Sequence, residues 1–77
     1  MIVKVEYYDP TVFNNWEERL ESEKETPFLC IAIGEVVNDS GSFLRLAAMR
    51  CDENDTFSCR MVIPKGCIVS QKELKGE

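Results

Sequence analysis

Histidine is absent from this chain of 77 residues, and so is any glycine-rich loop that could cradle a phosphate. A nucleophilic cysteine needs a base or a cationic neighbour to hold it as a thiolate, so cysteine–histidine catalysis is excluded. The carboxylates lie in solvent-facing charge runs, without an apolar pocket to shift their pKa values. We therefore expect no catalytic residues, no cofactor and no small-molecule substrate, and the chain is predicted not to be an enzyme.

Metal-binding spacings are also lacking. The four cysteines, Cys30, Cys51, Cys59 and Cys67, are widely separated and form no CxxC pair of the kind that structural zinc sites use. The segment 52–55 lacks the glycine, spacing and terminal glutamate of a calcium loop. We expect no metal site and interpret the cysteines as reduced thiols in or near the core.

Long apolar runs are missing as well. The longest, around Phe28 to Ile33, is far shorter than the roughly 20 residues that span a bilayer. Met1 is followed by a strand-like segment without the basic region of a secretory signal. We therefore expect no membrane contact and a cytoplasmic location.

What is present is the composition of an ordinary globular protein, with 44% hydrophobic and 30% charged residues. A chain of this length suits one domain, here residues 1–77. The β-branched and aromatic segment Ile2–Tyr8 predicts a half-buried strand. Asp9-Pro10 is typical of a helix start. The spacing of Phe13, Trp16 and Leu20 then predicts an amphipathic helix over about residues 10–22, between the first two strands.

Three further strands are expected in a meander. The run from Phe28 leads into the turn-forming segment 38–42, and the acidic turn 52–55 joins Phe43–Cys51 to Thr56–Pro64. One face of this meander is expected to be the core: Leu29, Ile31, Ile33, Leu44, Leu46, Ala48, Cys59, Met61 and Ile63. Strict alternation would bury Glu35, so we expect a bulge near Gly34 that resets the register.

The segment 63–69 contains a proline and a glycine, which predict a short 3₁₀ turn before a last strand. This order of elements is that of a five-stranded small barrel, whose closure removes most exposed sheet edge. The predicted fold is therefore mainly β (β+α), a five-stranded antiparallel SH3-like or Sm-like small barrel with one helix between strands one and two.

A resemblance supports this fold. The segment 63–68 resembles the strand–3₁₀–strand corner of Src-homology-3 and Sm-like barrels. The wider pattern is an aromatic-rich first strand ending at Asp9, then Trp16, then Gly34-Glu35-Val36-Val37 and Leu44-Arg45-Leu46-Ala47. It resembles small uncharacterised proteins of bacteria, phages and prophages, although Glu35 stands where that pattern has an apolar residue. The resemblance implies a fold and a source, and no activity.

The second face of the meander is mixed, carrying Arg45, Ala47, Met49, Arg60 and Val62. Met, Arg and aliphatic side chains together are compatible with an interface. The helix could cover this face, a protein partner or second subunit could bind it, or each could take a part. These residues predict a non-enzymatic protein-binding module, in the setting of a phage-type accessory protein or an inhibitor of a host factor.

An alternative is an Sm-like or single-strand nucleic-acid-binding module. Arg45, Arg50 and Arg60 would contact phosphates, while Tyr7, Tyr8 or Trp16 would stack on bases. Against this stands a net charge of −5, from 9 basic and 14 acidic residues. A negative protein repels a phosphate backbone, so nucleic acid is an unlikely partner.

Overall fold

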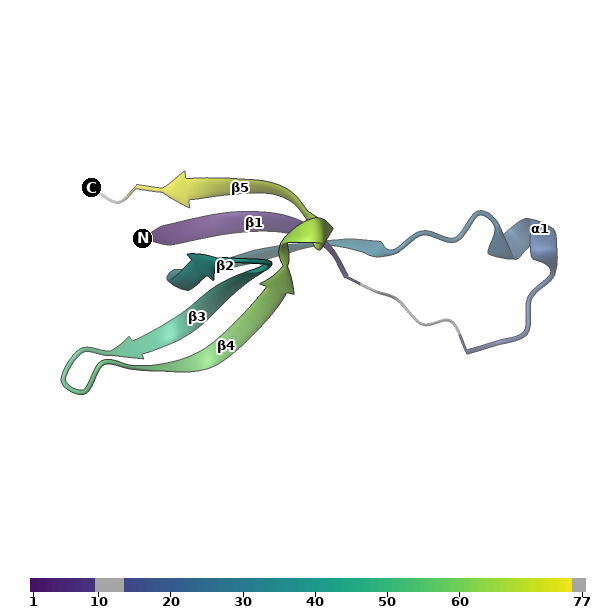
Figure 1. Cartoon of the computed structure of the whole chain (residues 1–77). Helices are drawn as coiled ribbons and strands as arrows, with labels where there is room; N and C mark the ends of the chain where they lie inside the picture. The colour runs from purple at the N-terminus through teal and green to yellow at the C-terminus, as the bar shows by residue number, and fades with distance from the viewer. Residues whose placement is uncertain (10–13, 76–77) are drawn as a thin grey trace.

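The computed structural model describes residues 1–9 and 14–75, and in this part the chain forms one antiparallel sheet (Figure 1). The elements are β1 (Ile2–Asp9), α1 (Arg19–Ser22), β2 (Phe28–Ser40), β3 (Phe43–Cys51), β4 (Thr56–Pro64), the 3₁₀ helix η1 (Lys65–Cys67) and β5 (Ile68–Leu74). The strand order is β4-β3-β2-β1-β5. The mainly β class, the five antiparallel strands and the 3₁₀ turn are confirmed.

The turns lie where their residue types predict them. Gly41, between β2 and β3, has a φ of 64°, a backbone conformation that residues with a Cβ rarely adopt. Residues 52–55 form the loop between β3 and β4. The pairs Leu44–Ile63 and Leu46–Met61 follow from that loop, as predicted.

The long strand β2 holds the two halves of the sheet together. Its first half pairs with β1, and its second half pairs with β3 from Glu35 onward. A bulge lies between Val36 and Asn38, so the predicted bulge exists but falls after Gly34. Gly34 permits a close approach, because a Cβ there would lie 3.0 Å from the Ala47 carbonyl oxygen. Beyond this point β3 and β4 run at an angle to β1 and β5, so the sheet bends (Figure 1).

The core lies on one side of the bent sheet, which we call the inner face. Its buried members are Val3, Val5, Leu44, Leu46 and Ile63, and Tyr7, Ala32, Val36 and Ile68 pack against them. The sequence correctly predicts Leu44, Leu46 and Ile63 as core. It misses Val3 and Val5, which lie on β1 and face the same way.

The predicted core positions Leu29, Ile31 and Ile33 are wrong. Val3 and Val5 pair with Gly34 and Ala32, so it is the even-numbered, small residues of β2 that face inward. Ile31 and Ile33 lie on the opposite side and are each 60% exposed. Small residues on the concave side are what allow the strand to bend, and the bulky ones are therefore left outside.

Three further positions predicted as core, Ala48, Cys59 and Met61, are exposed. The pairing of β2 with β3 ends at Ala47, so no third strand covers Ala48 and Cys59 beyond that point. Met61, opposite Leu46, lies on the edge strand β4. The four cysteines are free thiols, with Cys30 and Cys67 half-buried and Cys51 and Cys59 exposed. The expectation of core thiols is therefore wrong for Cys51 and Cys59.

The sheet does not close into a barrel, contrary to the SH3-like and Sm-like prediction. β4 and β5 stay at the two edges and do not pair with each other. Because the part of the β3–β4 hairpin beyond Ala47 extends past β2, it cannot wrap around the core, and Figure 1 shows the hairpin projecting from the sheet.

The helix predicted over residues 10–22 is not confirmed. Residues 10–13, including Phe13, lie outside the described part, and within residues 14–22 only α1 is helical. This single turn has no side-chain cap, and so short a helix is marginal without tertiary packing. Trp16 does not anchor the segment to the core, because its side chain is fully exposed. Residues 14–27, which we call the arm, project away from the sheet (Figure 1).

Candidate interaction surface on the β3–β4 hairpin

The five residues predicted to form a binding face lie in register on one side of the hairpin. Arg45 is opposite Val62 and Ala47 is opposite Arg60, while Met49 continues the row. Met49 and Val62 are each more than half exposed, and Arg60 is exposed. Ala47, however, is only 3% exposed because it pairs with Glu35 of β2. We call these residues the mixed face, and four of the five are within reach of a partner.

A hollow of about 550 Å³ adjoins the mixed face. Its lining comes mainly from β4, with contributions from β2 and β3: Val37, Arg45, Phe57, Ser58, Cys59, Arg60, Met61 and Val62. The sequence does not place Val37, Phe57 or Cys59 in the predicted binding face. The lining takes in all of residues 57–62, consecutive positions of the edge strand β4.

The backbone of β4 is irregular at Cys59, whose φ of 52° lies in the left-handed region. A non-glycine residue rarely adopts this conformation within a strand. Ladder pairs occur on either side, at Ala47–Arg60 and Met49–Ser58. The irregularity lies in the part of β4 that lines the hollow, and such distortions gather at functional positions.

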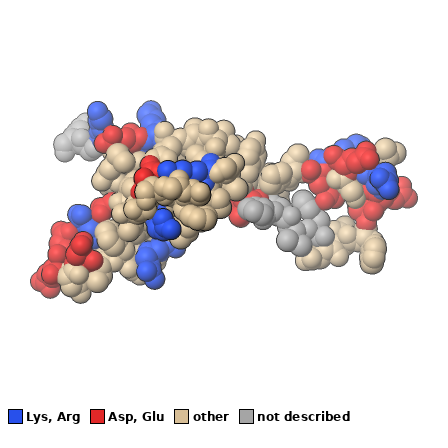
Figure 2. All heavy atoms as spheres, in the orientation of Figure 1, with Lys and Arg blue, Asp and Glu red and all other residues tan. Residues whose placement is uncertain are grey.

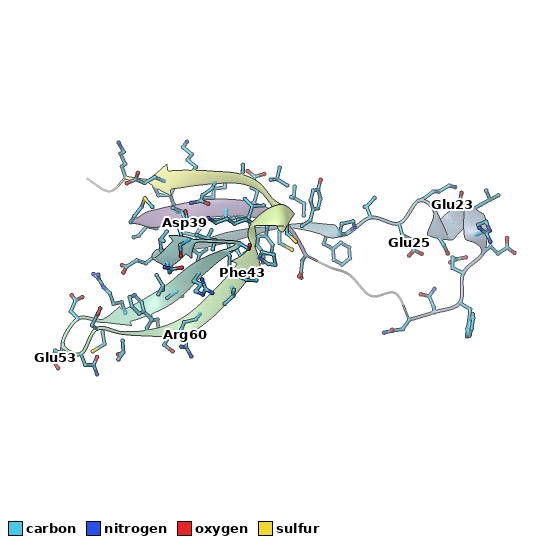
Figure 3. The ribbon with its side chains drawn as sticks, viewed as in Figure 1. Glu23, Glu25, Asp39, Phe43, Glu53 and Arg60 are labelled. Atoms are coloured by element: carbon cyan, nitrogen blue, oxygen red, sulfur yellow. The ribbon has the colours of Figure 1, made fainter. Side chains whose placement is uncertain are left out.

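The three arginines of the hairpin differ in how far their charge is already compensated. Arg45 donates a hydrogen bond of 3.0 Å to Asn38 Oδ1 and lies over the Phe43 ring at 5.6 Å. Arg50 forms ion pairs with Glu35 at 3.2 Å and Asp52 at 3.0 Å. Arg60, on the edge strand (Figure 3), has no ion pair or hydrogen bond to any residue of the described part.

Figure 2 shows that acidic side chains gather mainly at the two ends of the molecule, on the arm and at the tip of the β3–β4 hairpin. The hairpin tip contributes Asp52, Glu53 and Asp55. Basic side chains lie over the sheet between these ends. The mixed face is thus a local basic area on an acidic chain.

A cluster of polar side chains lies at the edge of the inner face. The Asp39 carboxylate of β2 forms an ion pair with Lys65 Nζ at 2.8 Å and accepts a hydrogen bond from Gln71 Nε2 at 3.4 Å. These hydrogen bonds hold the pKa of the Asp39 carboxyl below its ordinary value. The cluster ties the second half of β2 to η1 and β5, and we call it the Asp39 clasp.

A second hollow of about 350 Å³ lies near η1 and is lined by Tyr7, Tyr8 and residues of β4. Burial raises the pKa of the Tyr7 hydroxyl, with smaller contributions from Cys30 and Asp9. Of the three aromatic residues predicted to stack on bases, Tyr7 and Tyr8 thus line a different hollow from Arg60, and Trp16 lies on the arm.

Two further searches concern metals and membranes. Within residues 1–9 and 14–75, no three cysteine or carboxylate side chains gather as a metal site would require. The described helices include none with the length and apolar character needed to cross a bilayer.

Comparison with known proteins adds nothing to this geometry. No family model, no curated protein and no solved structure matches the chain. The resemblance to small proteins of bacteria and phages thus rests on the sequence pattern alone and stays a prediction.

Proposed function

We propose that this chain is a non-enzymatic protein-binding module that uses the mixed face. The observation that carries the proposal is the uncompensated charge of Arg60 beside the exposed apolar side chains of Met49 and Val62. Aromatic, methionine and arginine side chains are enriched in interface cores, and arginine is frequent among the residues that dominate binding energy. The adjoining hollow can accept a side chain of the partner.

The chemistry of this face defines the partner. The guanidinium of Arg60 pairs with a carboxylate of the partner, which it can bind through two parallel hydrogen bonds. Val62 and Phe57 line the same hollow as Arg60, and the exposed side chain of Met49 offers a further apolar contact on β3. The partner surface is therefore an apolar side chain next to an aspartate or glutamate, and the chain acts by stoichiometric contact, as an accessory or inhibitory protein does.

Nucleic acid is the weaker alternative. Of the three arginines that would contact phosphates, Arg50 already pairs with two carboxylates and Arg45 bonds to Asn38. Counterion release, which supplies most affinity for nucleic acid, would then depend on Arg60 and a few lysines of an acidic chain. A protein partner needs no such excess of positive charge.

Photo-crosslinking tests the proposal. A benzoylphenylalanine in place of Val62 is expected to yield an adduct of discrete mass in extract of the source cells, and Arg60→Glu in the same chain should abolish it. The matched control carries the crosslinker at Val69 of β5, an equally exposed apolar position. An adduct that persists with Arg60→Glu would contradict the proposal. So would binding of a labelled single-stranded oligonucleotide at low salt that Arg60→Glu removes.

A further inference from the structure

The side of the sheet opposite the core, which we call the outer face, is apolar along β2. Leu29, Ile31 and Ile33 form a continuous row, each more than half exposed. On β1 they are paired with Tyr8, Glu6 and Lys4. A row of β-branched and leucine side chains in water is unusual for a small monomer, and such patches mark interaction sites.

Two lysines lie beside this apolar row. Lys4 of β1 pairs with Ile33 on one side and with Lys72 of β5 on the other, so all three side chains point outward together. Like charges directly opposite in a sheet are destabilising. Neither lysine has an ion pair within the described residues. The outer face therefore presents an apolar strip with two lysines beside its Ile33 end and the carboxylate of Glu6 opposite Ile31.

The arm has the complementary character. Trp16 is 101% exposed and Leu20 is 71% exposed, so neither apolar side chain is packed into the described part of the chain. Residues 17–25 contain five acidic and two basic side chains. Figure 3 shows Glu23 and Glu25 on the arm, away from the sheet. Apolar side chains among carboxylates match an apolar strip beside lysines.

The exposed surface is too large for a self-contained monomer. The chain exposes 6299 Å², whereas a compact monomer of 8.8 kDa exposes about 4,800 Å². The radius of gyration is 16.1 Å, against about 11.5 Å expected for a compact domain of this length. The excess area, about 1,500 Å², exceeds the roughly 800 Å² that each partner contributes to a standard interface.

The arm is directed away from its own outer face. Pro27 has a fixed φ, and Thr26 before it is restricted to extended conformations, so the chain enters β2 without a sharp reversal. Figure 1 shows the arm continuing outward from the end of the sheet. The arm is free to reach the outer face of a second molecule, because that face can lie in the direction in which the arm projects.

We propose that the chain forms a two-fold symmetric dimer in which the arm of each copy covers the outer face of the other. Trp16 and Leu20 pack on the strip Leu29–Ile33, and the arm carboxylates lie over Lys4 and Lys72. The two arm contacts are equivalent and use both arms and both outer faces, so no further copy can add to the dimer. The strip Leu29–Ile33 and the mixed face lie on the same side of the sheet and adjoin at a hollow that Ile33 and Met49 both line. The residues on which the two proposals rest differ, so the dimer does not depend on the proposed function.

Sedimentation of the full chain, combined with the emission of Trp16, tests this dimer. The sequence contains a single tryptophan, so its emission reports on the arm alone. The expected results are a mass of twice 8.8 kDa and a blue shift of the emission that grows with protein concentration along with the dimer. Ile31→Asp should raise the dissociation constant by at least about tenfold, because it places a charge in the strip. Val62→Asp, at an equally exposed apolar position on the mixed face, should leave both readouts unchanged.

A charge test separates this arrangement from non-specific association. Lys4→Glu with Lys72→Glu should weaken the dimer, and added salt should weaken the original dimer more than this variant. A monomer at all concentrations overturns the proposal, whether the Trp16 emission is red-shifted, as in a free arm, or blue-shifted, as in an arm folded on its own sheet. A dimer that survives Ile31→Asp with Trp16 still exposed overturns it equally.

Discussion

The inner and outer faces of the β1–β2 strand pair carry similar apolar residues, but those of the inner face are buried and those of the outer face are exposed. Val3 and Val5 are 1% and 0% exposed, whereas Ile31 and Ile33 on the adjacent strand are each 60% exposed. Hydrophobicity does not separate them. The difference lies in curvature, because the sheet bends toward the side where Ala32 and Gly34 permit close approach. Burial in so small a sheet is decided by which side can become concave.

Truncation of the core should show the largest contrast between the faces. Leu44→Ala is expected to cost about 3 kcal/mol, because Leu44 is fully buried and a cavity remains. Ile33→Ala should cost less than about 0.5 kcal/mol when measured at concentrations where the chain is monomeric. Urea unfolding of both variants makes the comparison. Equal losses would show that the outer row is buried in the monomer after all.

A change at the bend tests the cause of the contrast. Gly34→Ala places a Cβ at 3.0 Å from the Ala47 carbonyl oxygen and 3.3 Å from the Leu46 Cβ, so β2 and β3 must separate. We expect a loss of about 1–2 kcal/mol, as for overpacked cores. Gly66→Ala is the control, since nothing lies within 4 Å of its added Cβ. Similar thermal stability of the two variants would refute the role of close approach.

The Asp39 clasp ties β2 to η1 and β5 at the edge of the inner face, and its contribution to stability should depend on pH. The pKa of Asp39 is lowered in the folded state, so its contribution is present above the ordinary pKa of 3.8 and is lost as pH falls below it. Asp39→Asn should therefore reduce stability at neutral pH and flatten its decline in acid. The effect should be smaller than that of Gly34→Ala, because the cluster is partly exposed. Glu53→Gln on the hairpin tip is the control. If the stability of Asp39→Asn fell in acid as steeply as that of the original chain, Asp39 would not be a source of this pH dependence.

The smallest effect on monomer stability is expected in the arm. Trp16→Ala should change the free energy of unfolding by less than about 0.5 kcal/mol, because the side chain is fully exposed. Unfolding followed by circular dichroism at low protein concentration measures it. A loss near that of Leu44→Ala would place Trp16 in the core, where the amphipathic spacing of the sequence had predicted it.

The candidate site shows where sequence reasoning reaches its limit. Alternation along β3 and β4 correctly predicts that Arg45, Met49 and Val62 share one face, since only the hairpin loop is needed to set that register. The burial of Ala47 and the pairing of Arg50 with Glu35 depend on β2, which crosses the hairpin only in the folded chain. The left-handed backbone at Cys59 has no signal in the residue type.

The same division holds for the fold. By itself the sequence determined the strands, the turns at Gly41 and at residues 52–55 and the 3₁₀ segment, because local backbone preferences act over a few residues. Only the tertiary structure decided that the bulge follows Val36, that Ile31 and Ile33 face outward and that the sheet stays open. A strand has two equivalent sides until distant strands pair and the sheet bends, and one residue of register exchanges them.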